Sequence, residues 1–305
     1  MNPKISVLMT VFNREQYVTE AIDSVLTQSY SDFELIIVDD CSTDGSYRLV
    51  QDAARKDLRI RVFQNAHNIG DYPNRNRAAS YARGDYLKYV DADDTIYPCC
   101  LELMLEPLER CSHVAIVFNT SLEKGSQSHI LSPLAAYRYH FFCSPLFYGG
   151  PLGSMIRKSV FEMFGGYPET RHTSDGEFHF ALAQRYSVAL VHGKLYFWRR
   201  HKMQESTIRR MTMRYRAKID SKRFRIELNA LANPKCPLPS QEISSAKSLV
   251  VRAIISKIGW FIRQNNPGSA CILLQQAGPS FLELISALIN RENTYHHKDI
   301  TSLNL

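Results

Sequence analysis

The stretch Tyr89-Val90-Asp91-Ala92-Asp93-Asp94 decides the fold of this chain, because it puts three carboxylates directly after an apolar run. The run, residues 86–90, predicts a buried strand, so the acidic turn would leave a sheet at the carboxyl end of that strand. Open α/β sheets bind their ligands at this edge. Clustered carboxylates repel one another unless a cation lies among them, and their oxygen atoms suit Mg²⁺ or Mn²⁺. The alternative is a solvated acidic turn that caps a helix beginning near Pro98.

The residues before this turn alternate between strand and helix patterns. Apolar runs predict buried strands at residues 5–9, 33–38 and 60–63. Apolar residues at helical spacing predict a helix within residues 15–28, and a second helix is expected at residues 74–82. Strands that alternate with helices form mostly parallel sheets with both faces covered. The first hundred residues therefore predict an α/β domain.

Four short motifs follow these strands in order. They are Thr10-Val11-Phe12-Asn13, Val38-Asp39-Asp40-x-Ser42-x-Asp44-Gly45, Asn68-x-Gly70-x-x-x-x-Arg75-Asn76 and Val90-Asp91-x-Asp93-Asp94. Each motif alone is a weak signal, but four in order make a strong one. Together they resemble the inverting glycosyltransferases of family 2, which have the nucleotide-sugar-binding GT-A fold. The resemblance is close over the first hundred residues and continues more loosely to about residue 207.

The resemblance implies which residues bind the sugar donor. Thr10 and Phe12 correspond to the segment that lines the nucleobase pocket. Asp39 corresponds to the acid that recognises a uracil-type base, and Arg75 to the basic residue near the base and phosphates. Asp91 is similar to the acid at the ribose. A carboxylate can accept hydrogen bonds from an imide N–H or from ribose hydroxyls, although an Asp in such a turn can also cap the following helix.

The resemblance also implies a metal-held diphosphate. Asp93 is similar to the residue that ligates Mn²⁺ or Mg²⁺, and such a metal neutralises the charge that develops on the leaving group. The run Trp198-Arg199-Arg200-His201-Lys202 resembles the family's Tyr-Arg-x-His segment. Arg199 would clamp the leaving phosphates. His201 would donate to the diphosphate or complete the metal shell, or it is a solvated residue in a basic run.

A catalytic base is expected at the start of a helix in the second half of the chain. The Gly165-Gly166-Tyr167-Pro168 stop resembles the family's glycine-glycine-aromatic segment, and Asp175 matches the position of its general base. Ser174 replaces the Glu that is usual beside it. The structural alternative is a capping box, Ser174-x-x-Glu177, in which Asp175 favours the helix dipole. Both roles can coexist, and Glu177 is the second candidate for the base.

The charge of the chain is unevenly distributed. The formal net charge is +7, and residues 199–225 alone hold eleven Lys and Arg against two acids. This segment, the basic belt, therefore carries +9 and the remainder of the chain −2. A basic belt suits anionic partners such as a nucleotide diphosphate or an acidic membrane surface. No nucleic-acid recognition motif accompanies it, so nucleic acid is not expected as a partner.

The length and hydropathy of the chain predict two regions. At 305 residues with 45 % hydrophobic residues, the chain suits a GT-A glycosyltransferase domain at residues 1–210 and a helical C-terminal region at 211–305. A Pro-rich break lies at residues 232–239. Apolar residues at helical spacing within 251–262 and 281–289 predict amphipathic helices. These helices either pack as a small subdomain or form a membrane contact or a dimer surface.

Several features favour a cytoplasmic protein. The seven cysteines include no C-x-x-C pair, which is typical of reduced thiols. The chain enters its first predicted strand directly after Lys4, so no cleavable signal peptide is expected. No apolar run approaches the length of a membrane span. We expect a cytoplasmic location, peripheral at the inner face of the plasma membrane where the basic belt and C-terminal helices contact lipid.

The expected reaction is transfer of a sugar, with inversion, from a nucleotide-diphosphate sugar to a hydroxyl. The resemblance implies a UDP-sugar as donor and a bacterial surface glycan or its lipid-linked precursor as acceptor. Two alternatives are a non-catalytic nucleotide-sugar-binding module and a sugar-phosphate nucleotidyltransferase. A nucleotidyltransferase needs a Gly-rich basic loop after the first strand, which residues 10–15 do not supply. The presence of Asp91, Asp93 and Asp175 argues against a non-catalytic module.

Overall fold

The computed structural model describes residues 2–120, 128–169, 173–201, 204 and 212–279. The chain divides into two compact units. The first unit comprises Met1–Ser132, Tyr148–Phe178 and Tyr186–Arg199, and the second comprises Pro133–Phe147, His179–Arg185 and Arg200–Leu305. The predicted boundary between residues 210 and 211 lies outside the described residues and stays a prediction.

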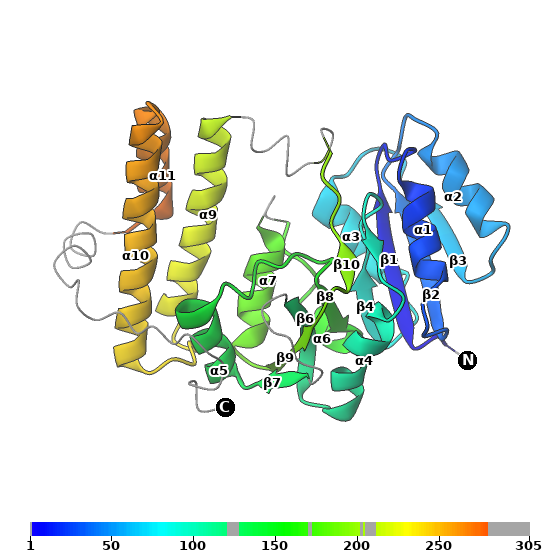
Figure 1. Ribbon diagram of the computed structural model, residues 1–305, viewed down its shortest axis with the longest axis horizontal. Coiled ribbons are helices and arrows are strands. Elements are labelled where there is room, and N and C mark those ends of the chain that lie inside the picture. The colour runs from blue at the N-terminus through cyan, green and yellow to red at the C-terminus, as the bar shows by residue number, and fades with distance from the viewer. Residues whose placement is uncertain (1, 121–127, 170–172, 202–203, 205–211, 280–305) are drawn as a thin grey trace. The chain divides into compact units, whose positions relative to one another are not determined.

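The first unit is built on an eight-stranded sheet with the order β3-β2-β1-β4-β8-β6-β9-β7 (Figure 1). Its strands are β1 Ile5–Val11, β2 Phe33–Asp39, β3 Ile60–Gln64, β4 Tyr86–Tyr89, β6 Val114–Thr120, β7 His129–Leu131, β8 Ser154–Arg157 and β9 Ser187–His192. A separate two-stranded antiparallel sheet joins β5 Thr95–Ile96 to β10 Tyr196–Phe197. The strands expected near residues 5, 33, 60 and 86 are confirmed, with ends that differ by one or two residues.

The sheet is mostly parallel, as the sequence predicts. Strands β3, β2, β1 and β4 run parallel, whereas β8 is antiparallel to both β4 and β6. Strand β9 returns parallel to β6, and β7 closes the edge antiparallel to β9. In the register of the first strands, Val11 pairs with Asp39 and Leu8 with Tyr89. The carboxyl ends of β1, β2 and β4 therefore meet at one edge of the sheet.

Helices cover both faces of this sheet. They are α1 Val18–Leu26, α2 Ser46–Ala54, α3 Asp71–Ser80, α4 Cys100–Arg110 and α6 Lys158–Met163. Helix α7, Ser174–Ala183, begins in the first unit, and its residues from His179 onward are assigned to the second. Alternate β1 residues, Val7 and Met9 among them, pack in one cluster with Ile22 of α1 and Met104 of α4. Ser6 and Leu8, on the opposite face, are equally buried. Burial on both faces explains why these strands are continuous apolar runs in the sequence.

Helix α3 begins three residues earlier than the sequence predicts. It starts at Asp71, directly after Gly70, whose φ of 91° lies in the region that favours glycine. Pro73 then falls in the first turn of the helix, where backbone N–H groups have no intrahelical acceptor and a missing N–H costs little. The early start adds Asp71 and Tyr72 to the helix, and both side chains contact predicted site residues.

The second unit consists of helices. They are α5 Pro133–Arg138, the π-helical η1 Tyr139–Cys143, α9 Met213–Ala232, α10 Ser240–Arg263 and α11 Pro267–Ala277. Helices α9, α10 and α11 lie side by side (Figure 1). Two contacts join α9 to α10: a Lys257–Asp220 ion pair of 2.9 Å, and the Arg216 guanidinium, which lies 4.6 Å from the Trp260 ring centre. The predicted break at residues 232–239 separates α9 from α10. The amphipathic helix expected at 281–289 lies outside the described residues.

No helix in the described part of the chain combines the length and the apolarity that a membrane crossing requires. The predicted amphipathic segment at residues 251–262 lies within α10, where Val251, Ile254 and Phe261 are buried. Ile262, at the end of the same helix, is 57 % exposed. The apolar face of α10 is therefore used for packing within the second unit, and one large apolar side chain at its end remains accessible.

Candidate active site

The first part of the site lies where β1 and β2 end. Thr10 is half-buried at the end of β1, and the Phe12 ring beyond it is 43 % exposed. Asp39 ends β2 fully buried, and its Oδ2 accepts hydrogen bonds from the Ser42 backbone N–H at 2.9 Å and from the Gln64 amide at 3.2 Å. Its Oδ1 is buried and has no hydrogen-bond partner among the described residues. A buried carboxylate oxygen without a donor is suited to a ligand that supplies one.

The neighbouring Asp40 has a structural role. Its carboxylate accepts hydrogen bonds from the Asn65 amide at 2.6 Å and from the backbone N–H groups of Ile69 and Gly70, both at 2.9 Å. Asp40 therefore holds the turn that leads into α3. Of the two adjacent acids that end β2, Asp40 has its donors within the protein, whereas Asp39 keeps one oxygen available.

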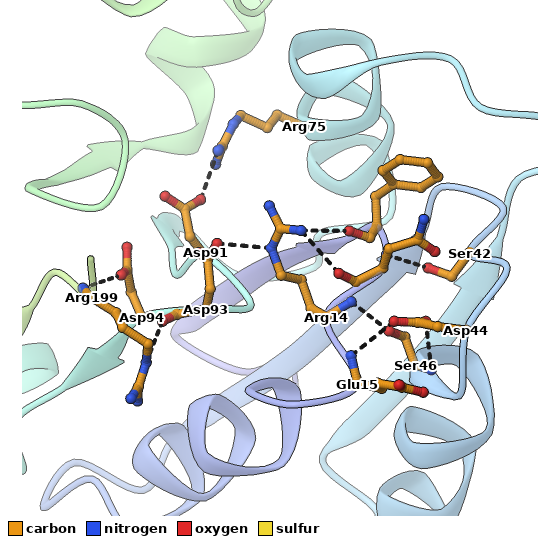
Figure 2. Close-up of polar contacts among 12 residues, drawn as sticks. Arg14, Glu15, Ser42, Asp44, Ser46, Arg75, Asp91, Asp93, Asp94 and Arg199 are labelled. Atoms are coloured by element: carbon orange, nitrogen blue, oxygen red, sulfur yellow. Dashed lines mark hydrogen bonds and ion pairs between the residues drawn. The ribbon is translucent and has the colours of Figure 1, made fainter. Parts of the chain in front are cut away.

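Helix α3 brings Arg75 to the acidic turn that follows β4. Its Nη2 donates to Asp91 Oδ1 at 2.7 Å, and its Nε donates to Asp71 Oδ1 at 2.8 Å (Figure 2 shows the Arg75–Asp91 pair). Burial alone would lower the pKa of Arg75, but the two carboxylates outweigh it and hold that pKa well above its usual value. The structure thus joins two predicted donor-binding residues, and Asp71 is a partner that the motifs did not indicate.

Asp93 lies beside a cation of its own chain. Its Oδ2 accepts from Arg14 Nε at 2.8 Å, and Arg14 Nη1 also donates to the carbonyls of Phe12 at 3.1 Å and Asn13 at 2.9 Å (Figure 2). The guanidinium therefore spans the ends of β1 and β4. Sequence reasoning missed Arg14, although it directly follows the first motif. Its positive charge offsets part of the repulsion among the three acids.

Arg199 contacts the other side of the acidic turn. Its backbone N–H donates to Asp94 Oδ1 at 2.8 Å, its Nε donates to the Asp93 carbonyl at 3.0 Å, and its Nη2 donates to Glu20 at 2.6 Å. Burial, together with the charge of Asp91, raises the pKa of Asp94 to about 8, although the Arg199 N–H opposes that shift. The acidic turn therefore carries less negative charge near neutral pH than its three acids imply.

The acidic turn fits a divalent metal only if other oxygen atoms complete the shell. Across the described residues, no three His, Cys, Asp or Glu side chains are grouped so as to hold a metal ion. Carboxylate oxygens of Asp93 are suitable ligands for Mn²⁺ or Mg²⁺, and phosphate or water oxygens commonly supply the remaining positions. Asp94 Oδ2 is also buried and has no hydrogen-bond partner among the described residues.

His201, the other predicted metal residue, belongs to the second unit. It is half-buried, and its backbone carbonyl accepts from the Gln204 N–H at 3.2 Å. Its role at a metal stays a prediction.

Asp175, the predicted base, lies in the first turn of α7 and receives a hydrogen bond from α3. The Tyr72 hydroxyl donates to Asp175 Oδ1 at 2.8 Å. Asp175 is half-buried, whereas Glu177 is exposed. The helix already includes Ser174, and the Glu177 N–H donates to the Thr173 carbonyl at 3.0 Å. The helix thus begins one residue earlier than the capping box predicts.

The mostly parallel sheet, with acids at the carboxyl ends of β2 and β4, agrees with the GT-A fold that the four motifs predict. The family model described as glycosyl transferase family 2 matches residues 6–164, which is more than half of the chain. The chain belongs to glycosyl transferase family 2. The resemblance inferred from the four motifs is thereby confirmed.

Curated relatives are similar in sequence to part of this chain. It is 35 % identical over 175 residues to EpsE, a proposed glycosyltransferase of Bacillus subtilis, covering 56 % of this chain and 62 % of EpsE. It is 35 % identical over 148 residues to WcaA, a proposed colanic acid biosynthesis glycosyl transferase of Escherichia coli K12, covering 48 % of this chain and 53 % of WcaA. The matches thus span little more than half the length of these relatives.

Solved structures share the fold. A mannosyltransferase, PcManGT, from Pyrobaculum calidifontis, solved with GDP-Man and Mn²⁺, matches with a TM-score of 0.59 at 16 % identity and covers 95 % of this chain and 87 % of its own. TarS of S. aureus, solved with UDP-GlcNAc, also matches with a TM-score of 0.59, at 20 % identity, covering 82 % and 71 %. The predicted GT-A fold with added C-terminal helices is confirmed.

Proposed function

We propose that this protein is an inverting glycosyltransferase that moves a sugar from a nucleotide-diphosphate sugar to a hydroxyl acceptor. One observation carries the proposal: helix α3 contacts both halves of the reaction site. Arg75 binds Asp91 on the donor side at 2.7 Å, and Tyr72 binds Asp175 on the acceptor side at 2.8 Å. Membership of family 2 supports the same reaction.

We also propose residues 1–210 as the catalytic domain and 211–305 as a helical C-terminal region.

The nucleotide is proposed to be a uridine diphosphate. The available Asp39 Oδ1 would accept the imide N–H of uracil, since this carboxylate has its other oxygen already bonded. The exposed Phe12 ring and Thr10 would line the base. Asp91 would accept from the ribose hydroxyls, and Arg75 would orient it. Among the structural neighbours, one is solved with UDP-GlcNAc and another with GDP-Man, so nucleotide-sugar binding accompanies this fold.

The diphosphate is proposed to lie over Asp93 and Arg199. Mn²⁺ or Mg²⁺, when bound, supplies positive charge that stabilises the leaving diphosphate. Asp93 would hold that ion, with His201 as the proposed further ligand. Arg199 would add charge-assisted hydrogen bonds to the phosphate oxygens. The Mn²⁺ in the PcManGT structure supports a divalent ion for this fold.

The chemical step follows from the position of Asp175. Its carboxylate takes the proton of the acceptor hydroxyl as the oxygen attacks the anomeric carbon. The bond from that carbon to the diphosphate oxygen breaks at the same time, and the diphosphate leaves with the electron pair. A single displacement inverts the anomeric configuration. No covalent sugar intermediate is required, so one carboxylate suffices for this step.

The acceptor is proposed to be a bacterial surface glycan or its lipid-linked precursor. The names of two relatives support this class: WcaA refers to colanic acid biosynthesis, and TuaG of Bacillus subtilis, 39 % identical over 104 residues, to teichuronic acid biosynthesis. We propose a cytoplasmic location at the inner face of the plasma membrane. A lipid-linked acceptor would be presented at that surface.

A screen of nucleotide sugars tests the donor assignment. We expect a UDP-sugar with Mn²⁺ to raise the Tm of the protein, and Asp39→Asn to weaken UDP binding about tenfold or more, because the imide N–H loses a charged acceptor. Asp52→Asn, at a partly exposed acid of α2, is the control and should bind UDP normally. Unchanged UDP affinity in Asp39→Asn would refute the base assignment. A protein that no nucleotide sugar stabilises would refute the proposed function.

The proposed membrane contact uses α9. Its exposed cations recur at helical spacing and form one face, which we call the α9 stripe: Arg214, Lys218, Lys222 and Arg225. Anionic lipids attract such a stripe through charge alone, so added salt should weaken the contact.

Vesicle binding checks this contact. We expect the full-length protein to bind anionic vesicles, less as salt rises, and Lys218→Glu with Lys222→Glu to lower that binding by more than tenfold. Each reversal changes the local charge by two, and each cation near the surface contributes about 1 kcal/mol. Lys235→Glu, at an exposed position between α9 and α10, is the matched control. Equal partitioning to neutral and anionic vesicles would rule out electrostatic docking.

A further inference from the structure

A tyrosine at an unspecified position of the third motif contacts the proposed base. Tyr72 lies in the first turn of α3, and its hydroxyl donates to Asp175 Oδ1 at 2.8 Å across 103 residues of chain. The tyrosine is only 7 % exposed, whereas the carboxylate of Asp175 is half-buried. One carboxylate oxygen is therefore bound from the protein side, and Oδ2 is left for another partner.

The Tyr72 ring is itself held in place. It meets the Tyr167 ring edge to face, with ring centres 5.5 Å apart and planes at 71°, and the Arg75 guanidinium lies 5.9 Å from its ring centre. Burial, with the nearby charge of Asp175, raises the pKa of Tyr72 well above its usual value. The hydroxyl therefore keeps its proton at neutral pH and remains a donor to the carboxylate.

A second contact from α3 holds the segment that precedes the base. The Asn76 amide donates to the Tyr167 carbonyl at 2.8 Å, and its Oδ1 accepts the Tyr167 N–H at 2.9 Å. Gly166, beside it, has φ of 80°, and a Cβ there would lie 2.7 Å from Asn76 Oδ1. Helix α3 thus contacts both the glycine-glycine-aromatic segment and Asp175. The Tyr72 hydrogen bond is therefore one of several contacts that hold this part of the chain against α3.

We propose that Tyr72 is a positioning residue for Asp175: its hydroxyl fixes Oδ1 so that Oδ2 takes the acceptor proton. The inference rests on the proposed function, because it assumes that Asp175 is the base. A carboxylate that the protein already holds in one orientation loses less conformational freedom when the acceptor binds. A base must also lie within hydrogen-bond reach of the acceptor hydroxyl.

Among the groups around Asp175, the Tyr72 hydroxyl is the one whose removal tests the proposal most directly. Tyr72 and Tyr167 both interact electrostatically with Asp175, and burial raises the pKa of each well above its usual value. Arg75 and Asp91, which act on Tyr167, are paired with one another. Glu177 lies on α7 itself and is exposed. Removing the Tyr72 hydroxyl therefore removes a donor to Asp175 without removing a charge.

The test is Tyr72→Phe, which keeps the ring packing. We expect kcat to fall about tenfold with an unchanged donor KM, because the base is then held less well and donor binding does not involve this hydroxyl. Tyr81→Phe, at the end of the same helix, removes a hydroxyl that accepts from Arg77 at 3.2 Å and should leave kcat and KM unchanged.

A thermal-unfolding cycle measures the contact without relying on activity. Tyr72→Phe should lower Tm by a few degrees in the wild-type background and by much less in an Asp175→Ala background. Equal Tm shifts in both backgrounds would show that Tyr72 and Asp175 do not stabilise one another. A clear coupling in Tm with a normal kcat would overturn the positioning role. Full transfer by Asp175→Asn would instead reject the base assignment, which is a different outcome from either.

Discussion

Replacing Asp175 by Asn is expected to lower kcat by about a hundredfold or more while donor binding stays intact. Asn keeps the shape of the side chain, and its Oδ1 can still accept from the Tyr72 hydroxyl, which donates to Asp175 at 2.8 Å. What it loses is the ability to take a proton from the acceptor. The measurement is steady-state transfer with saturating donor, together with the affinity for UDP and Mn²⁺.

The control for this prediction is Glu177→Gln. Glu177 lies two residues further along α7, is exposed and was the second candidate for the base. We expect this variant to keep near-normal kcat. If Asp175→Asn transfers sugar at the wild-type rate and Glu177→Gln does not, the base is Glu177. The hydrogen bond from Tyr72 to Asp175 would then play no part in catalysis.

The second large effect is expected at Asp93. Asp93→Asn should abolish measurable transfer and weaken UDP binding in the presence of Mn²⁺, because a neutral amide is a poorer ligand for a hard cation and the leaving diphosphate then keeps its charge. The fold should change little, because Asn keeps the shape of the side chain and its oxygen can still accept from Arg14 Nε, which donates to Asp93 at 2.8 Å. Calorimetric titration of Mn²⁺ with UDP measures the loss directly.

Asp91→Asn provides the comparison for Asp93. Asp91 pairs with Arg75 and is assigned to the ribose, so its loss should raise the donor KM rather than abolish turnover. Removing metal with a chelator should lower the activity of the wild type far more than the residual activity of Asp93→Asn. Near-normal turnover of Asp93→Asn at saturating Mn²⁺ would overturn the metal assignment.

Local patterns were sufficient to predict the donor side of the fold. Apolar runs marked β1, β2, β3 and β4 to within two residues, because strands buried on both faces must be apolar throughout. The carboxyl ends of parallel strands meet at one edge, so Asp39 and Asp91 were expected to lie at the same edge. Helix α3 then placed Arg75 against Asp91, as the motif order implies.

Contacts between side chains far apart in the chain could not be predicted in this way. Arg14 reaches Asp93 across 79 residues, and Tyr72 reaches Asp175 across 103. Neither pair has a periodic signal, because each depends on how helices and loops pack onto the sheet. The start of α3 at Asp71 was also missed, although the first turn of a helix accommodates a proline such as Pro73.

The antiparallel strand β8 has a consequence for chain synthesis. Strand β4 pairs on one side with β1, which is made before it, and on the other with β8, whose Met155 opposes Lys88. Roughly 65 residues separate the two strands, and a ribosome that adds about 5–20 residues per second takes about 3–13 s to make them. During that interval the nascent sheet exposes the unpaired backbone of β4, and an open strand edge is a template for pairing with other chains. The arrival of β8 therefore covers this open edge of β4.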